Sequence, residues 1–242
     1  MRCPTPIERT WMLIQLHGPV VRVVLGALSS LALLVGLHST DLRNASVPAS
    51  VLAILAGAFY TQLFEYAYHR LLMHGRWIRF ITRRHLQHHR IFHGENFASR
   101  RIEDLQHVAG PWFLFPAILL AHYLMVRLVL APELVVAFLA GCVLHYLAFE
   151  LSHWFAHVEG NLFDRSLQRV PVVGELRRQQ LIHHRVHHEL PDRNFNFIPP
   201  YAGDHLGSRA AELRGAARAE GISESLRSID AENAGIVGSS GR

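Results

Sequence analysis

Four long apolar runs restrict the fold of this chain more than any other feature of its sequence. They cover residues 20–37, 47–68, 110–130 and 132–151. About 20 apolar residues in a helix cross the roughly 30 Å of bilayer hydrocarbon, so each run is a candidate spanning helix. Only 18% of the 242 residues are charged, which is low for a soluble domain. We therefore expect an all-α integral membrane helical bundle of about four transmembrane helices. A bundle in which two runs are half-inserted hairpin helices is the alternative.

The runs also set the expected domain organisation. Residues 1–19 are an N-terminal extension, residues 20–207 the membrane domain, and residues 208–242 a polar C-terminal tail. The tail is rich in Ala, Gly, Ser and Glu, so we expect a short surface helix and a partly disordered end. The two cysteines, Cys3 and Cys142, form no CxxC pair and imply no disulfide framework.

Arginine supplies all 24 basic side chains, and the arginines gather beside the apolar runs. Eight of them lie between the second and third runs: Arg70, Arg76, Arg79, Arg83, Arg84, Arg90, Arg100 and Arg101. Basic residues flanking spans favour the cytoplasmic side. With four spans, this link and both termini are then cytoplasmic. The arginines follow no phosphate-tracking stripe, so we expect no nucleic-acid partner.

Eighteen histidines stand in this apolar chain, and ten of them lie in four regularly spaced clusters. The clusters are His69 and His74; His85, His88 and His89; His153 and His157; and His184, His187 and His188. Residues three and four apart share a helix face, so HxxHH and HxxxH each aim their imidazoles at one point. The five-residue spacing of the first pair requires a helix end. Because the second and fourth runs end on the same side, a four-span bundle brings all clusters to its cytoplasmic face. Imidazole suits iron and zinc, so we predict a di-metal centre in a histidine-rich cap.

These four clusters resemble the histidine boxes of the fatty acid hydroxylase/sterol desaturase superfamily, over about residues 64–200. The segment Asn194-Phe195-Asn196-Phe197 resembles the Asn-aromatic-Gly-Phe element of fatty acid 2-hydroxylases, with Asn196 in place of the glycine. The first cluster with Gly75 also resembles a carotenoid hydroxylase box. The resemblance implies two metal ions, taken as iron, and activation of O2 with electrons from a separate reductase protein. Zinc or another divalent metal is expected to replace iron in some purified preparations.

Five further residues are candidates for supporting the ligands. Glu65 and Glu150 are carboxylates inside apolar runs, where they need either a histidine N–H or an arginine as partner. His183 either replaces His184 as a ligand or orients a neighbour. Asn194 and Asn196 either hold an imidazole or a metal-bound water, or serve a turn.

The remaining histidines are expected outside the site. His17, His38, His107, His122 and His205 have no partner at ligand spacing, so they are interpreted as interface or surface residues. His145 precedes His153 by eight residues. It either lines a substrate channel or bonds to a neighbouring helix.

The sequence therefore predicts a multi-pass membrane oxidoreductase that hydroxylates or desaturates an unactivated C–H bond of a bilayer lipid, with a fatty-acyl chain favoured as substrate. A sterol or carotenoid ring oxidase of the same chemistry is the first alternative. A membrane haem protein that transfers electrons is the second, and it would need paired histidines inside facing spans. A metal transporter or sensor is the third, and it would need ligands along a transmembrane path.

Overall fold

The computed structural model describes residues 6–209, with side chains from residue 17 onward, so Cys3 and the predicted helix and disordered end of the tail lie outside it. Its regular elements are all helices, and one isolated bridge pairs Ser99 with Val158. The predicted all-α fold class is confirmed. The elements are α1 (Pro6–Leu37), α2 (Ser39–Leu42), α3 (Val47–Tyr68), η1 (His69–Met73), α4 (Arg79–Ile91), η2 (Gly94–Asn96), α5 (Ile102–Leu105), α6 (Leu114–Val126), α7 (Pro132–His157), α8 (Leu162–Leu167), α9 (Pro171–Glu189) and η3 (Asp204–Leu206).

Three segments are long and apolar enough to cross a membrane: His17–Leu37 in α1, Val47–Met73 in α3 and η1, and Pro132–His157 in α7. The third apolar run is different. It forms only the 13-residue helix α6, which is about 20 Å long at 1.5 Å per residue. The bundle thus has three candidate spans and one shorter apolar helix. The first helix also begins earlier than its apolar run, at Pro6, and contains Pro19.

Close contact between α3 and α7 forms the centre of the bundle. Glycines permit this contact, because a Cβ on Gly57 would lie 2.0 Å from the Phe138 carbonyl oxygen. A Cβ on Gly141 would lie 2.0 Å from the Ile54 carbonyl oxygen. Small residues allow membrane helices to approach at their backbones. The two helices that carry histidine clusters at their C-terminal ends are therefore held together directly.

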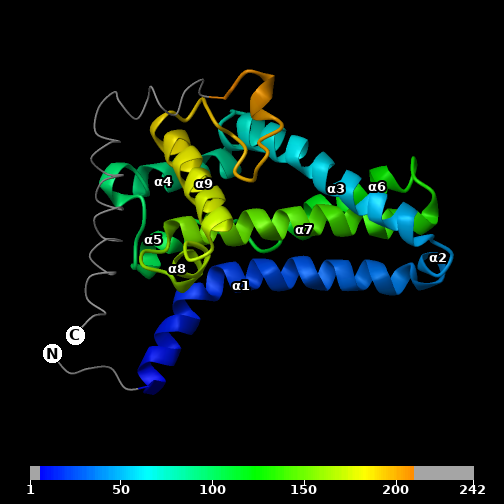
Figure 1. Ribbon diagram of the computed structural model, residues 1–242, viewed down its shortest axis with the longest axis horizontal. Helices are drawn as coiled ribbons and strands as arrows, with labels where there is room; N and C mark the ends of the chain where they lie inside the picture. The colour runs from blue at the N-terminus through cyan, green and yellow to red at the C-terminus, as the bar shows by residue number, and fades with distance from the viewer. Residues whose placement is uncertain (1–5, 210–242) are drawn as a thin grey trace.

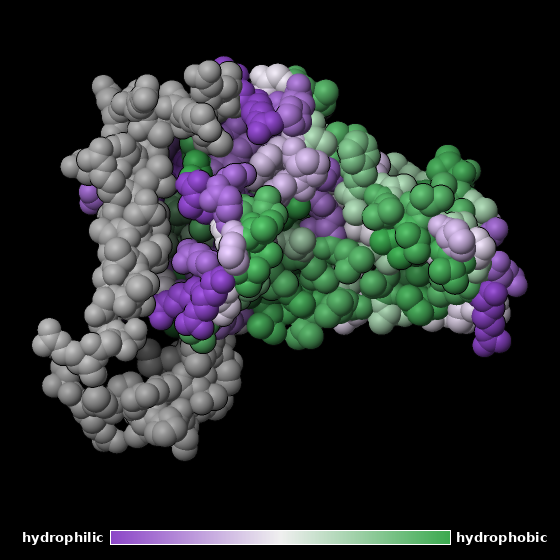
Figure 2. Space-filling model, viewed as in Figure 1, coloured by the Kyte–Doolittle hydropathy of each residue, from purple (hydrophilic) through white to green (hydrophobic). Residues whose placement is uncertain are grey.

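The cluster-bearing helices meet at one end of the bundle (Figure 1). The C-terminal ends of α3 and α7 reach that end, and α4 and α9 lie across it. The spans between the two ends present an apolar surface, whereas polar side chains gather near α8 and α9 and, in a smaller group, at the opposite end beside α2 (Figure 2). The long helices thus deliver all four histidine clusters to the same end of the bundle.

Candidate metal centre

Ten buried or half-buried imidazoles form two separate groups of five. Group A consists of His69, His74, His85, His89 and His187. Group B consists of His88, His153, His157, His184 and His188. Within each group, one nitrogen from every ring lies within 4.8 Å of the corresponding nitrogens of the others. The two groups contain the ten histidines singled out in the sequence, and His183 belongs to neither.

Each HxxHH cluster divides its histidines between the groups. In α4, His85 and His89 belong to group A, whereas His88 belongs to group B. In α9, His184 and His188 belong to group B and His187 to group A. The expectation that HxxHH aims three rings at one point is therefore wrong. Successive residues in a helix differ by about 100°, so the third and fourth residues after a histidine lie on opposite sides of it.

A π-helical turn brings the unevenly spaced pair into group A. In η1 the His74 amide donates to the His69 carbonyl oxygen at 3.0 Å, which is the five-residue hydrogen bond that defines a π-helix. His74 caps this turn, in agreement with the predicted helix end. Gly75 is required next, because a Cβ there would lie 1.8 Å from the Leu71 carbonyl oxygen. The ring centroids of His69 and His74 are consequently 5.1 Å apart.

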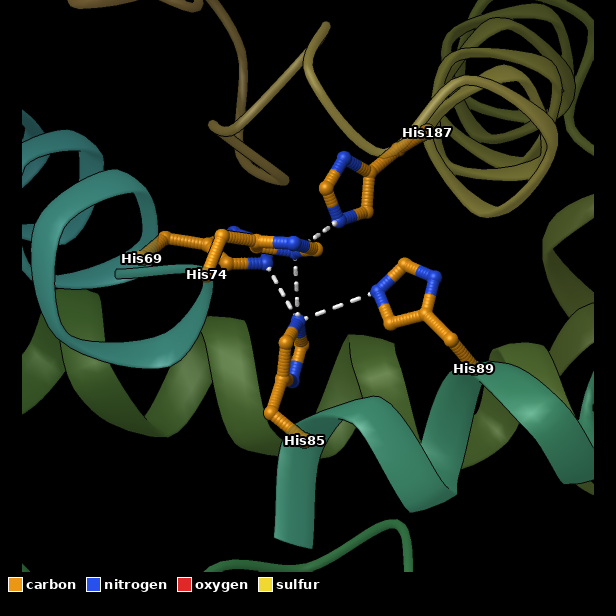
Figure 3. A group of neighbouring side chains, drawn as sticks. All are labelled: His69, His74, His85, His89 and His187. Atoms are coloured by element: carbon orange, nitrogen blue, oxygen red, sulfur yellow. Dashed lines mark hydrogen bonds between the residues drawn. The ribbon is translucent and has the colours of Figure 1, made fainter. Parts of the chain in front are cut away.

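The Nε2 atoms of group A converge on a common centre (Figure 3). His85 Nε2 lies 2.9 Å from His69 Nε2, 2.9 Å from His74 Nε2 and 3.0 Å from His89 Nε2. His74 Nε2 lies 3.2 Å from His187 Nε2. A single proton on one ring serves one such contact, so protons alone do not explain the three nitrogens around His85 Nε2.

Group B repeats this arrangement. His184 Nε2 lies 3.0 Å from His157 Nε2 and 3.1 Å from His188 Nε2. His153 Nε2 lies 3.2 Å from His88 Nε2. Two nitrogens bound at right angles to one metal ion, each at about 2.1 Å, lie about 3 Å apart. The spacing in both groups fits the edges of a coordination shell.

Backbone carbonyl groups fix which ring nitrogen carries the proton. The Nδ1 atoms of His69 and His187 donate to the carbonyl oxygens of Phe195 and Arg193, at 2.5 and 2.6 Å. In group B, His157 and His188 donate from Nδ1 to Phe97 and Phe92, at 2.7 and 2.6 Å. A neutral ring with its proton on Nδ1 offers the lone pair of Nε2. The loop after α9 thus orients ligands of group A, and the loop after α4 orients ligands of group B. Because the acceptors are backbone carbonyl groups, no residue type in the sequence marks this role.

Burial keeps the imidazoles outside the spans neutral. It lowers the pKa of His74 to about 4 and that of His89 to about 3. The pKa values of His184 and His187 lie well below the usual range, because burial and the neighbouring histidines both disfavour a positive charge. Neutral rings with converging lone pairs attract a cation. The residues of both groups therefore fit a bound metal ion.

Glu65 has a histidine N–H as partner, as expected, whereas Glu150 has a tyrosine hydroxyl instead. Glu65 accepts hydrogen bonds from His145 Nε2 at 2.7 Å and from the Phe197 amide. Glu150 accepts a hydrogen bond from the Tyr146 hydroxyl at 2.9 Å. In the part of the chain that the structure describes, neither bonds to a group A or group B histidine, and neither pairs with an arginine. His145 bonds to α3, as one of its two predicted roles requires, and it also lines the cavity described below.

Asp204, which the sequence reasoning missed, organises the loop after α9. It is fully buried and accepts hydrogen bonds from the Phe195 and Asn196 amides at 2.7 and 3.0 Å. It also accepts from the Ser208 hydroxyl at 2.8 Å and faces His183 Nε2 at 3.1 Å. His183 is thus engaged outside both groups, in support of the choice of His184. Because His183 and Asp204 are 21 residues apart in the sequence, no local pattern predicted this pair.

The two asparagines serve the same loop. Asn196 donates to the Gln62 carbonyl oxygen at 2.8 Å and accepts from the Gly203 amide at 2.9 Å. Asn194 has a left-handed backbone, with φ of 53°. Its side-chain amide donates to the His183 carbonyl oxygen at 3.3 Å. These hydrogen bonds shape the loop and connect it to α3 and α9, in agreement with the turn alternative. Between and after them, the rings of Phe195 and Phe197 pack on His69 and His184 respectively, with centroids 5.7 and 4.6 Å apart.

The single histidines occupy different environments. His17 accepts a hydrogen bond from the Trp154 indole at 3.0 Å, and His38 lies between Asp41 and Tyr123. His205 is exposed. His107 and His122 line the same cavity as the metal-site histidines. Interpretation of His122 as a surface or interface residue is wrong, because its side chain is buried within the bundle.

One cavity connects both histidine groups with the interior of the bundle. Its volume is about 1330 Å³, including its open mouth. The wall contains His69 and His85 of group A and His88, His153 and His184 of group B. Apolar side chains of α3, α6 and α7 form much of the rest, including Phe64, Leu119 and Phe149. An elongated apolar molecule in this cavity would lie against both groups.

No protein-family model matches this sequence, and no curated protein sequence matches it. Among solved structures, full-length Scs7p, in which only the hydroxylase domain is visible, matches with a TM-score of 0.53 and 20% sequence identity. The match covers 77% of this chain and 66% of that chain, slightly less than two thirds of its length. At 20% sequence identity, this similarity is evidence for a shared fold only. The chain is an all-helical, histidine-rich bundle with the fold of that hydroxylase domain.

Proposed function

We propose that this protein is a membrane oxidoreductase of the fatty acid hydroxylase/sterol desaturase superfamily, which oxidises an unactivated C–H bond of a lipid. One observation carries the proposal: two groups of five converging imidazoles form part of the wall of one largely apolar cavity. Similarity in fold to a hydroxylase domain supports it. Residues 20–207 form the catalytic unit.

Each histidine group would hold one metal ion. His69, His74, His85, His89 and His187 would ligate the first, and His88, His153, His157, His184 and His188 the second. Neutral nitrogen ligands suit iron, with zinc or another divalent metal as a substitute. Two iron ions would supply activation of O2 for hydroxylation or desaturation.

The protein's own side chains would bind and orient the substrate. A fatty-acyl chain fits the apolar wall between α3, α6 and α7, where burial excludes water from the reacting carbon. The rings of Phe195 and Phe197 pack against ligands of opposite groups and restrict their movement. Carbonyl groups of the two loops keep the Nε2 atoms free of protons.

Electrons would come from a separate protein. Arg76, Arg79, Arg83 and Arg90 are exposed beside the site, and in the described residues none forms an ion pair. Such a surface favours an acidic partner. The same arginines support a cytoplasmic position for the histidine groups.

Expression in a host, followed by mass spectrometry of its lipids, tests the proposal. Wild-type protein should produce a lipid with a mass increase of 16, or a loss of two hydrogens, that is absent from cells expressing His88→Ala. Supplying acyl lipids and sterols separately identifies the substrate class. A lipid profile that is the same for wild type and variant would overturn the proposal.

A further inference from the structure

The cavity has a polar end within the bundle, away from the histidine groups. His122 of α6 and Thr61 of α3 line the cavity there, and the aromatic rings of Tyr60 and Phe64 flank His122. His122 is 6% exposed. An ionisable side chain in such an apolar setting is costly, and it indicates a function when no partner satisfies it.

The hydrogen bonds of His122 determine what it offers. Its Nδ1 donates to the Ile118 carbonyl oxygen at 2.7 Å, so the neutral ring presents the lone pair of Nε2. Among the described residues, no side chain bonds to this Nε2 atom. The ring packs edge-on against Phe64, with centroids 4.6 Å apart, and this contact restricts its orientation.

Thr61, like His122, offers a hydrogen-bond acceptor to the cavity. Its hydroxyl donates to the Gly57 carbonyl oxygen at 2.7 Å, and the oxygen retains lone pairs to accept a hydrogen bond. Cys142, which also lines the cavity, donates its thiol to the same carbonyl at 3.5 Å. The donors of His122, Thr61 and Cys142 are therefore used within the protein, and acceptors on His122 and Thr61 remain.

The positions of Phe64 and Tyr60 along α3 give the distance between His122 and the group A histidines. Phe64 precedes His69 by five residues and Tyr60 precedes it by nine. At 1.5 Å per residue, His122 beside these two rings lies about 8 to 14 Å along the helix from a group A histidine. A lipid that reaches both ends of the cavity would carry its polar group at this distance from the oxidised carbon.

We propose that His122, assisted by Thr61, binds a hydrogen-bond donor of the lipid substrate, in the simplest case a hydroxyl group. This specificity site rests on the proposed function for its role in catalysis, but its binding chemistry is independent of the metals. The unsatisfied acceptor would discriminate against a lipid in which the donor is absent.

Matched lipids in detergent-solubilised protein test this site. The probes are a long-chain primary alcohol and its methyl ether, which lacks the donor. Binding is measured as the rise in thermal unfolding temperature with ligand concentration. We expect the wild type to bind the alcohol about tenfold more tightly, a typical effect of one hydrogen bond.

Variants separate recognition from packing. His122→Leu should reduce the preference to about one, Thr61→Val should reduce it in part, and His122→Gln should restore part of it. Leu120→Ala, on the exposed side of α6, is the matched control and should keep the wild-type preference. Equal binding of both probes by the wild type, or an unchanged preference in His122→Leu, would overturn the site.

The two proposals fail in different ways. A His122-dependent preference without any oxidised lipid would leave the binding site intact and contradict the proposed oxidoreductase function. An oxidised lipid without this preference would support the proposed oxidoreductase function and contradict the binding site at His122. His122→Gln provides a folded reference if the leucine variant is unstable.

Discussion

The Nε2 atoms of His157 and His184 face each other at 3.0 Å across two helices, α7 and α9. His157 donates its Nδ1 proton to the Phe97 carbonyl, and His188, on the other side of His184, donates its own to Phe92. A proton on His184 Nε2 pairs with the lone pair of one neighbour, so the lone pair of the other neighbour remains without a donor. A metal ion resolves this conflict for all three rings.

Metal content should respond separately to the two histidine groups. His187→Ala removes a ligand of group A and His88→Ala a ligand of group B. Each variant should lower the metal content from two ions per chain towards one and abolish activity, because the remaining nitrogens bind the affected ion more weakly. Mass spectrometry of purified protein measures the metal.

His93→Ala is the control for this experiment. His93 is 62% exposed and lies outside both groups. It should retain two metal ions and full activity. Full activity in His88→Ala or His187→Ala would refute the ligand assignment.

Acid should destabilise the metal-free protein. Burial lowers the pKa of His74 to about 4 and of His89 to about 3, from an unfolded value of about 6.5. The unfolded chain therefore binds protons that the folded chain excludes as the pH falls below about 6.5. The thermal unfolding temperature should be highest at neutral pH and fall steadily down to about pH 4. Equal unfolding temperatures at pH 7.5 and pH 5 would contradict neutral, buried imidazoles.

Removal of the Asp204 carboxylate should destabilise the loop that bears Phe195. Asp204→Ala leaves two buried amides and the Ser208 hydroxyl without their acceptor, at a cost of about 3 kcal/mol. Thermal unfolding measures the loss, and metal affinity should also fall, since His69 bonds to Phe195. Asp192→Ala, at an exposed position of the preceding turn, should have little effect. Similar stability of both variants would contradict this role.

The contact between α3 and α7 should not tolerate a methyl group. Gly57→Ala places a Cβ 2.0 Å from the Phe138 carbonyl oxygen, so the helices must separate at a cost of about 1–3 kcal/mol. Gly36→Ala is the matched control, because nothing lies within 4 Å of its added Cβ. Unfolding in detergent should distinguish them, and equal stability would argue against close helix packing.

The sequence predicted the ten grouped histidines because regular spacing on helices places imidazoles together. It did not predict their division into two groups, since that depends on how α4 and α9 are rotated against α3 and α7. The π turn at His69 was indicated only by the five-residue spacing. Asp204 and His122 lacked any local pattern, because their partners are separated in sequence or are backbone atoms. The orientation of the bundle and the ligand assignment remain predictions.

Isotopic labelling of the product tests the central claim most directly. Cells or reconstituted membranes containing the wild-type protein should be given a lipid substrate and ¹⁸O2, with His88→Ala as control. The account predicts that the wild type forms an alcohol whose new oxygen is ¹⁸O, or a lipid with two hydrogens fewer, and that the variant forms neither. An alcohol that carries only oxygen from water, or one formed equally by His88→Ala, would contradict it.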